Sequence, residues 1–388
     1  MARGIIKDIV ITPVAFHDMP LLNSVGVHEP YALRSIIEVV TDEEYGLGES
    51  YGDAVHIARL QKAAKALVGL SVYDTNTMEL RCIAALDEDT ATGGDGMAGL
   101  VTTASAADKV FSPFEVACLN IQGKLAGVPV YQLLGGRVRD TVPFSADLVK
   151  QARQIIDEYG FTAIKLKGGV FQSDEEIAGV RALREAFPGV PLRIDPNAAW
   201  TVETSQRVAR ALDGVLEYLE DPTPDIAGMA AVAKTASMPL TTKPSWPSRT
   251  CRLVLSDHHF WGGLRKSQVL AGICATWGMS LSMHSNSHLG ISLAAMTHLA
   301  AATRNIDYAC DTHWPWKRKD EDVVVDGALT WKDGGVQVPT KPGLGVELDR
   351  ERLAKLHQQY LDCGLTKRDD TAYIQKFHPE YSNKLPRW

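Results

Sequence analysis

Two stretches, Phe161-Thr162-Ala163-Ile164-Lys165-Leu166-Lys167-Gly168-Gly169 and Ile194-Asp195-Pro196-Asn197, decide the fold of this chain. Each is a short apolar run that ends in charged or polar residues, and a helix-like segment follows each run. In a parallel sheet covered by helices, strand interiors are apolar and functional side chains collect where the strands end. The pattern therefore predicts a parallel α/β sheet whose strand ends carry chemistry.

Strand-like and helix-like segments alternate from Thr141 onward. After a first strand at Val142–Ser145, the predicted strand ends are Lys167, Asp195, Glu220, Lys243, Asp257, His284 and Asp311. They recur about every 23 to 28 residues, which fits one strand, one helix and two short loops. Eight such units predict an α/β fold of the (β/α)8 TIM-barrel type, with the strand ends at one mouth. Only 13 residues separate Lys243 from Asp257, so the joint between strands five and six is predicted to be too short for an ordinary helix.

The chain divides into three predicted parts. Residues 1–140 are predicted to form an α+β capping domain, 141–330 the barrel, and 331–388 a C-terminal segment that returns to the cap. In the capping domain, apolar spacing predicts two strands and two helical regions, at Ile5–Val14, Arg34–Val40, Asp53–Leu70 and Pro113–Leu134.

Composition excludes several classes of protein. A formal net charge of −7 without a basic cluster argues against a nucleic-acid partner, and no apolar run is long enough to span a membrane. The six cysteines are scattered and form no Cys-x-x-Cys pair, which favours reduced thiols in a cytoplasmic protein. We expect a small-molecule substrate, and a homo-oligomer remains open.

The predicted mouth collects nine polar residues: Lys165, Lys167, Asp195, Asn197, Glu220, Asp257, His284, Asn286 and Asp311. Each also has a purely structural interpretation. An aspartate at a strand end is often the N-cap of the next helix, a lysine can be a solvated end, and a histidine can be a hydrogen-bonded core residue. His284 and His288 have zinc-ligand spacing, but only on a helix, and Leu281–Met283 is predicted to be a strand. Their convergence at one mouth favours function.

The order of these motifs resembles the enolase superfamily. Lys-x-Lys ends the second strand, Asp-x-Asn the third and Glu-x-Pro the fourth, and Asp257 and His284 end the sixth and seventh. Longer stretches, Leu255–Gly263, Met283–His288, Asp311–Trp314 and Asn23–His28, resemble glucarate dehydratases and related acid-sugar dehydratases. The resemblance covers nearly the whole chain.

The resemblance implies a magnesium-dependent hydro-lyase, most closely one that converts D-glucarate to 5-dehydro-4-deoxy-D-glucarate. Such an enzyme removes a proton α to a carboxylate, stabilises the enediolate and eliminates a β-hydroxyl as water. Lys167 and His284 would be the two acid–base residues, with His284 oriented by Asp257, and Lys165 would contact the substrate carboxylate. Asp195 and Glu220 would hold Mg²⁺, which prefers hard oxygen ligands. The substrate would be bound by Asn23, His28, Asn197, Ser285, Asn286 and Asp311.

Three features depart from that family pattern. Lys243 occupies the position of the third metal ligand, and a charged lysine offers no lone pair. The joint behind Lys243 is short, and Ser145-Ala146-Asp147 leads almost directly into a helix predicted to start near Leu148. Alternative interpretations are therefore a racemase or epimerase, an impaired paralogue that only binds an acid sugar or a partner subunit, or a chain assembled incorrectly from its gene.

Overall fold

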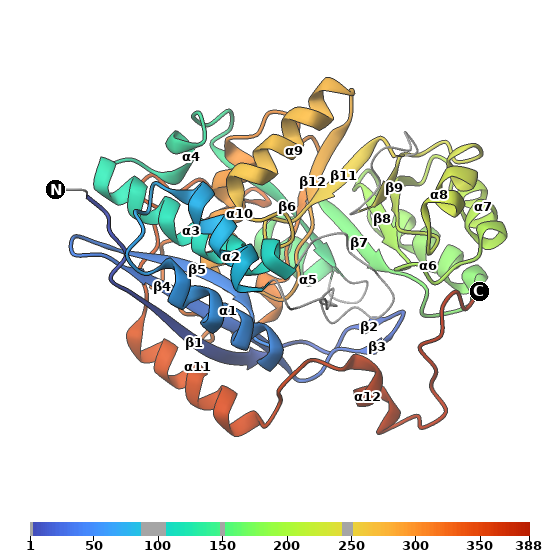
Figure 1. Cartoon of the computed structure of the whole chain (residues 1–388). Coiled ribbons are helices and arrows are strands. Elements are labelled where there is room, and N and C mark those ends of the chain that lie inside the picture. The colour runs from blue at the N-terminus through green and yellow to red at the C-terminus, as the bar shows by residue number, and fades with distance from the viewer. Residues whose placement is uncertain (1–2, 87–105, 148–151, 243–250) are drawn as a thin grey trace.

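The computed structural model of the chain describes residues 3–86, 106–147, 152–242 and 251–388. Figure 1 shows two parts, an antiparallel sheet with its helices (blue to cyan) and a parallel strand-and-helix part (green to orange). The chain is an α/β protein in which an N-terminal antiparallel capping domain lies beside a parallel, barrel-like domain. Across the described ranges, no helix is both long and apolar enough to cross a membrane.

The sheet of the capping domain has the order β1 (Asp8–His17), β4 (Tyr31–Val40), β5 (Tyr45–Tyr51), and all pairs are antiparallel. β1 begins three residues after its predicted start at Ile5 and ends three residues after its predicted end at Val14, because its ladder with β4 runs from Asp8 to His17. Pro13 is tolerated because β1 is an edge strand of this sheet, where a residue that cannot donate a ladder hydrogen bond is accommodated.

Four helices accompany this sheet: α1 (Ala54–Leu67), α2 (Thr75–Ala85), α3 (Ala106–Ala126) and α4 (Val130–Leu133). α1 lies within its predicted range, whereas the second range, predicted as one helical region, contains a break at Gly127, whose φ is +70°. Glycines in β5 let α3 approach closely, because a Cβ atom at Gly46 or Gly48 would clash with the α3 backbone.

The barrel-like sheet contains eight parallel strands in the described residues: β6 (Thr141–Asp147), β7 (Ala163–Lys167), β8 (Leu192–Asp195), β9 (Leu216–Glu220), β10 (Leu240–Thr242), β11 (Leu253–Ser256), β12 (Ser280–Met283) and β13 (Cys310–Asp311). Neighbours from β6 to β12 pair in sequence order, and β13 pairs with β6. A parallel bridge between Leu281 and Ile306 connects β12 to the segment that leads into β13. The predicted strand ends that fall within the described residues therefore lie at the same end of one sheet.

Six helices follow these strands: α5 (Ala152–Tyr159), α6 (Ser173–Ala186), α7 (Val202–Ala211), α8 (Ile226–Ala233), α9 (Leu264–Thr276) and α10 (Gly290–Ala301). Residues 251 and 252, the described part of the joint between β10 and β11, form no helix. Lys243 and the rest of that joint lie outside the described residues, as does the helix start predicted near Leu148.

α10 connects the two domains. Every residue from Gly290 to Ala301 is buried, and the helix contacts β5 and α4 of the cap as well as β6 of the barrel-like domain. A helix that is apolar all round is a core helix. Its first turn therefore lies where cap residues can reach the barrel.

The C-terminal segment contacts both domains. β14 (Trp331–Lys332) and β15 (Gly335–Gln337) form a hairpin, and β15 pairs antiparallel with β6. The 3₁₀ turn η1 (Trp314–Trp316) precedes this hairpin in the chain. The long helix α11 (Arg350–Cys363) follows the hairpin and packs on β1. α12 (Asp370–Gln375) packs on the small hairpin of β2 (Leu22–Asn23) and β3 (Gly26–Val27). Figure 1 shows α11 and α12 below the cap strands.

Candidate active site

Two lysines of β7 form the first part of the site. Lys165 and Lys167 are two residues apart on one strand, so they point to the same face. Lys165 Nζ donates to Glu220 Oε2 at 3.0 Å and to Asp311 Oδ2 at 2.5 Å. Lys167 Nζ donates to Asp195 Oδ2 at 2.8 Å. The structure therefore brings both lysines together with carboxylates from three other strands.

Three carboxylates converge beside these lysines. Asp195 ends β8, Glu220 ends β9, and Asp221 follows with a φ of +35°. All three are buried, and each places an oxygen within 4.8 Å of the others. Asp195 and Glu220 were predicted as metal ligands and Asp221 was not. The positive φ that accompanies its position beside Glu220 cannot be read from the residue type.

The donor set fits a divalent cation. Glu220 Oε1 and Asn197 Oδ1 are buried and have no hydrogen-bond partner among the described residues. Burial, and then the negative charge of Asp195, raises the pKa of Glu220 although Lys165 lies beside it, so a further positive charge would stabilise its anion. Oxygen ligands of an octahedral Mg²⁺ lie about 3 to 4 Å apart, given metal–oxygen distances of about 2.1 Å. The three carboxylates offer oxygens within 4.8 Å of one another, which is close to that spacing.

Asn197 holds Asp195 in place. Its backbone N donates to Asp195 Oδ1 and its side-chain Nδ2 to Asp195 Oδ2, both at 2.9 Å. The residue has a φ of +48°, a left-handed conformation that asparagine tolerates. This places Asn197, predicted to bind substrate, against the first carboxylate.

A histidine–aspartate pair lies at the ends of two neighbouring strands. His284 follows β12 and Asp257 follows β11, and Ser256 pairs with Met283 in the ladder. His284 Nδ1 lies 3.0 Å from Asp257 Oδ2. Both side chains are almost wholly buried. Hydrogen bonds and the charge of His284 lower the pKa of Asp257, although burial opposes this effect, so the carboxylate is held as an anion.

A second group with metal-ligand geometry, Asp257, His258 and His259, lies beside this pair. A cation there is disfavoured, because Arg34 Nη2 lies 2.9 Å from His259 Nε2 and adds a positive charge. Asp257 already accepts hydrogen bonds on both oxygens, from His284 on one and His259 on the other. We assign this group to hydrogen bonding and the carboxylates of β8 and β9 to the metal.

The predicted cap residues are buried polar groups with partners. Asn23 Nδ2 donates to Asp370 Oδ2 at 2.8 Å, and His28 Nδ1 lies 3.1 Å from Asp18 Oδ2. Burial, and then the charge of Arg368, lowers the pKa of His28. Asp18, Arg368 and Asp370 were not predicted as part of the site. Arg368 and Asp370 lie in a distant C-terminal segment, and no sequence motif connects that segment to the cap.

The remaining predicted residues lie after β12 and at β13. Asn286 Nδ2 donates to Tyr51 OH of the cap at 3.1 Å. Ser285 Oγ is buried without a hydrogen-bond partner in the described ranges. Asp311 accepts from Lys165 and, through Oδ1, from Ser145 Oγ at 2.8 Å. Asp311 therefore holds Lys165 in place in this structure.

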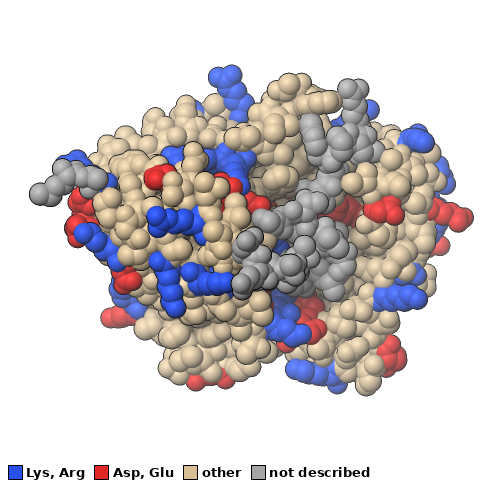
Figure 2. Space-filling view, viewed as in Figure 1, with Lys and Arg blue, Asp and Glu red and all other residues tan. Residues whose placement is uncertain are grey.

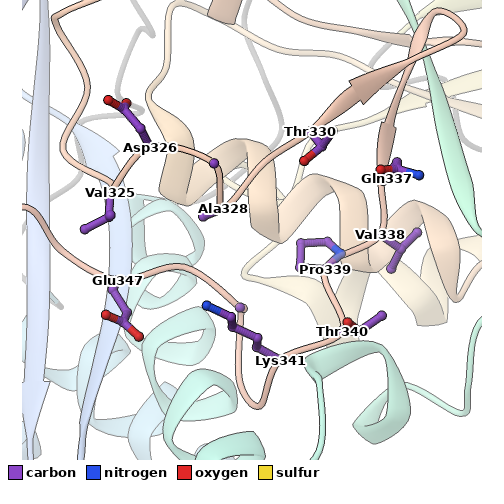
Figure 3. Close-up of a pocket in the computed structure, with 12 residues that line it drawn as sticks. Val325, Asp326, Ala328, Thr330, Gln337, Val338, Pro339, Thr340, Lys341 and Glu347 are labelled. Carbon is purple, nitrogen blue, oxygen red and sulfur yellow. The ribbon is translucent and has the colours of Figure 1, made fainter.

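A separate surface pocket of about 340 Å³ lies among residues 325–347. Figure 3 shows Asp326, Lys341 and Glu347 around it. Asp326 is bound on both oxygens by Arg352. None of the residues that line this pocket is one of the strand-end residues above. On the face shown in Figure 2, basic and acidic side chains of the described residues are interspersed.

Comparisons with known proteins show which family the chain belongs to. Residues 147–352 match the family described as enolase C-terminal domain-like. A probable glucarate dehydratase from Streptomyces coelicolor is 46% identical, over 97% of each chain. That alignment extends over 423 positions, whereas this chain has 388 residues, so gaps in this chain must interrupt it.

Two solved structures are similar over almost their full length. An enolase from Gibberella zeae complexed with magnesium, formate and sulfate is 67% identical with a TM-score of 0.97, covering 100% of this chain and 98% of its own. An enolase from Mycobacterium smegmatis complexed with tartrate is 56% identical with a TM-score of 0.93, covering 99% and 98%. On the family match, the near-complete coverage and the shared fold, the chain belongs to the enolase superfamily.

Proposed function

We propose that this chain is built as a magnesium-dependent dehydratase of an acid sugar, with D-glucarate as the first substrate to test. The observation that carries the proposal is the grouping of two acid–base pairs with three carboxylates at one end of a parallel sheet. Lys167 bonds to Asp195, and His284 bonds to Asp257. Asp195, Glu220 and Asp221 supply the oxygen ligands.

In this proposal His284 removes the α-proton. Because its Nδ1 bonds to Asp257 Oδ2, we assign the proton transfer to Nε2. Asp257 holds the ring orientation and stabilises the imidazolium that forms. The same nitrogen then returns its proton to the departing β-hydroxyl, so the carbon–oxygen bond breaks and water leaves. Lys167 serves the opposite face of the α-carbon, and Lys165 binds the carboxylate.

Asp195, Glu220 and Asp221 would hold Mg²⁺. Bound there, the ion would supply Lewis-acid stabilisation of negative charge on the substrate carboxylate. Support comes from the buried Glu220 oxygen without a partner in the described residues and from the magnesium in the Gibberella zeae enolase.

The substrate class follows from charge and relatedness. A cationic lysine pair suits a carboxylate, and buried amides and imidazoles suit hydroxyl groups. Asn23, His28, Asn197, Ser285, Asn286 and Asp311 are the proposed polar contacts. The Streptomyces coelicolor relative is described as a probable glucarate dehydratase, and the Mycobacterium smegmatis enolase was complexed with tartrate, a hydroxylated diacid.

We further propose that residues 141–330 form a (β/α)8 barrel with a shortened joint between β10 and β11. Eight parallel strands and the pairing of β13 with β6 support a closed barrel. The caps of its mouth would come from residues 1–140 and 331–388, since α12 packs on β3.

The deciding experiment is a turnover screen of hexarate and pentarate stereoisomers, each with and without Mg²⁺, with the keto product identified by NMR. The proposal expects a keto-deoxy acid that forms only with Mg²⁺. Interconversion of epimers without loss of water would favour the racemase or epimerase, which the two acid–base pairs also permit. Substrate binding without any conversion would favour an impaired paralogue. Lys243 and the short joint behind it are the sequence features that favour this alternative.

A further inference from the structure

We infer that Arg34, a residue of the capping domain, positions the Asp257–His284 pair by fixing the tautomer of His259. His259 would be the connecting residue, and it does not itself reach the substrate in this scheme. The hydrogen-bond assignment stands on geometry alone, whereas its consequence for catalysis rests on the proposed function.

Asp257 accepts hydrogen bonds on both carboxylate oxygens. Oδ2 faces His284 Nδ1 at 3.0 Å. Oδ1 accepts from the backbone N of His259 at 3.0 Å and faces the Nδ1 of the same residue at 2.9 Å. The orientation of the carboxylate, and so that of the His284 ring, therefore depends on His259.

The proton position on His259 follows from its other nitrogen. Arg34 Nη2 lies 2.9 Å from His259 Nε2. A guanidinium has donors and no acceptor, so Nε2 must present its lone pair. The ring proton then sits on Nδ1, where it donates to Asp257 Oδ1. Burial, and then the charge of Arg34, lowers the pKa of His259 well below its usual value, which agrees with a neutral ring.

Arg34 is itself held by the cap and by the helix that connects the domains. Its Nε donates to Glu49 Oε1 at 3.0 Å, and both side chains are almost wholly buried. Glu49 accepts from the backbone N of Leu289 and of Ser292, both at 2.8 Å, at the start of α10. Those N–H groups lack partners within the helix, and the helix N-terminus favours a negative charge.

A second contact extends the same arrangement toward the mouth. The Arg34 guanidinium lies 4.7 Å from the centre of the Tyr51 ring, and Tyr51 OH accepts from Asn286. Residues Arg34 and Tyr51 face each other in the β4–β5 ladder. Arg34 thus contacts both His259, which bonds to the Asp257 partner of His284, and Tyr51, which bonds to Asn286. Docking of the cap on the barrel-like domain would therefore orient His284.

The test reads the tautomer directly. In protein labelled with ¹⁵N-histidine, the His259 signals are assigned by their loss in His259→Phe. The proposal expects a neutral ring with the proton on Nδ1 in the unmodified chain. Because the Asp257 carboxylate also requires a donor at Nδ1, the two effects are separated in an Asp257→Asn background, whose amide can accept or donate. There, Asp257→Asn with Arg34 intact should keep the proton on Nδ1, and a mixture of tautomers is expected once Arg34→Met is added. A proton on Nε2 in the unmodified chain, or the same tautomer in Asp257→Asn with and without Arg34→Met, would overturn the inference.

Matched variants separate positioning from folding. Ser292→Ala removes the other neighbour of Nε2, 3.0 Å away, and should keep the tautomer because Arg34 remains. Arg34→Lys, a smaller change for use if Arg34→Met does not fold, keeps the charge and at least one donor and should keep the tautomer as well. A shift in Ser292→Ala without one in the Arg34 variants would assign the role to Ser292 and refute the proposal.

Kinetics adds a readout that a general loss of stability does not give. Arg34→Met should lower kcat about tenfold or more, with KM for the acid sugar changed less than threefold. Arg350→Met removes an arginine of α11, which bonds to Glu38 of the cap and not to His259, and should leave both constants unchanged. An equal loss in both variants would contradict a specific role. If the unmodified chain shows no turnover, the proposed function fails while the tautomer measurement still decides this inference.

Discussion

Lys165 on β7 reaches Asp311 on β13 at 2.5 Å, and its second partner is Glu220 on β9 at 3.0 Å. Strands far apart in the sequence thus meet at one ammonium group, which is 1% exposed. A buried ammonium is stable only when it is paired and hydrogen-bonded. Glu220 Oε2 and Asp311 thus hold the Lys165 ammonium group in place. Glu220 Oε1 has no hydrogen-bond partner in the described residues, so it is the oxygen that a cation would use.

The first prediction concerns the two acid–base residues. His284→Asn should abolish α-proton exchange from the His284 face, while Lys167 continues to exchange the α-proton of the opposite epimer. Solvent-deuterium exchange followed by NMR, run on both epimers, measures this. Lys167→Met serves as the control and should give the reverse preference. Equal loss for both epimers in both variants would argue against two independent faces.

The second prediction concerns the carboxylates. Glu220→Gln should weaken Mg²⁺ binding about tenfold or more, equal to about 1.4 kcal/mol, because one charged ligand is lost. Without Mg²⁺ the same variant should not lower Tm, because burial and Asp195 already disfavour the Glu220 anion. Calorimetry and thermal melting check the two effects. Glu217→Gln, also on β9, is the control and should leave Mg²⁺ binding unchanged.

The third prediction separates Lys243 from the short joint behind it. Lys243→Asn alone should leave Mg²⁺ affinity and the dehydration rate close to those of the unmodified chain, because a helix behind a barrel strand covers its outer face and fixes where the strand end points. Exposed apolar surface costs about 25 cal/mol per Å², so a strand face that no helix covers can cost several kcal/mol. A graft that replaces residues 243–252 with a full strand end, helix and loop carrying asparagine should raise both, once the segment after β6 is lengthened.

The measurements for that comparison are Mg²⁺ calorimetry, Tm and glucarate turnover on the point variant and the graft. A large gain in turnover in Lys243→Asn alone would mean that the short joint is tolerated and that the positive charge of Lys243 is what limits activity. A graft that raises Tm without activity would separate the stability defect from the catalytic one.

The fourth prediction concerns the pH dependence of stability at Glu115. Burial raises the pKa of Glu115 to about 7, although Leu264 N donates to it at 2.9 Å and Arg265 N at 3.3 Å. A carboxyl whose folded pKa is raised stabilises the fold below its unfolded pKa of about 4.5, and this contribution is lost as pH rises through about 7. The loss amounts to roughly 3 kcal/mol.

Glu115→Gln removes this titration, so the difference in unfolding free energy between the native chain and the variant should fall between pH 4.5 and 7.5. Urea unfolding across that range measures it. Ser112→Ala, at a buried position of the same helix without a titratable side chain, should give a curve parallel to that of the native chain. Parallel curves for Glu115→Gln would show that the buried carboxyl does not titrate in this range.

The sequence by itself determined the parallel α/β pattern and most strand ends, because a strand buried on both faces must stay apolar until it ends. Lys167, Asp195, Glu220 and Asp311 are the last residues of β7, β8, β9 and β13, as the alternating pattern predicted. The same local rule indicated the short joint after β10. Strand boundaries were less accurate: β1 spans Asp8–His17 and not Ile5–Val14, because its pairing with β4 sets where it begins and ends.

Only the tertiary structure decided which side chains meet. Asp221 joined Asp195 and Glu220 through a positive φ that the residue type does not announce. Arg34 meets His259 across 225 positions of sequence, and Asn23 meets Asp370 across 347. A hydrogen bond depends on distances of a few tenths of an ångström, and these are fixed by how the cap docks on the barrel-like domain, which no local pattern of residues encodes.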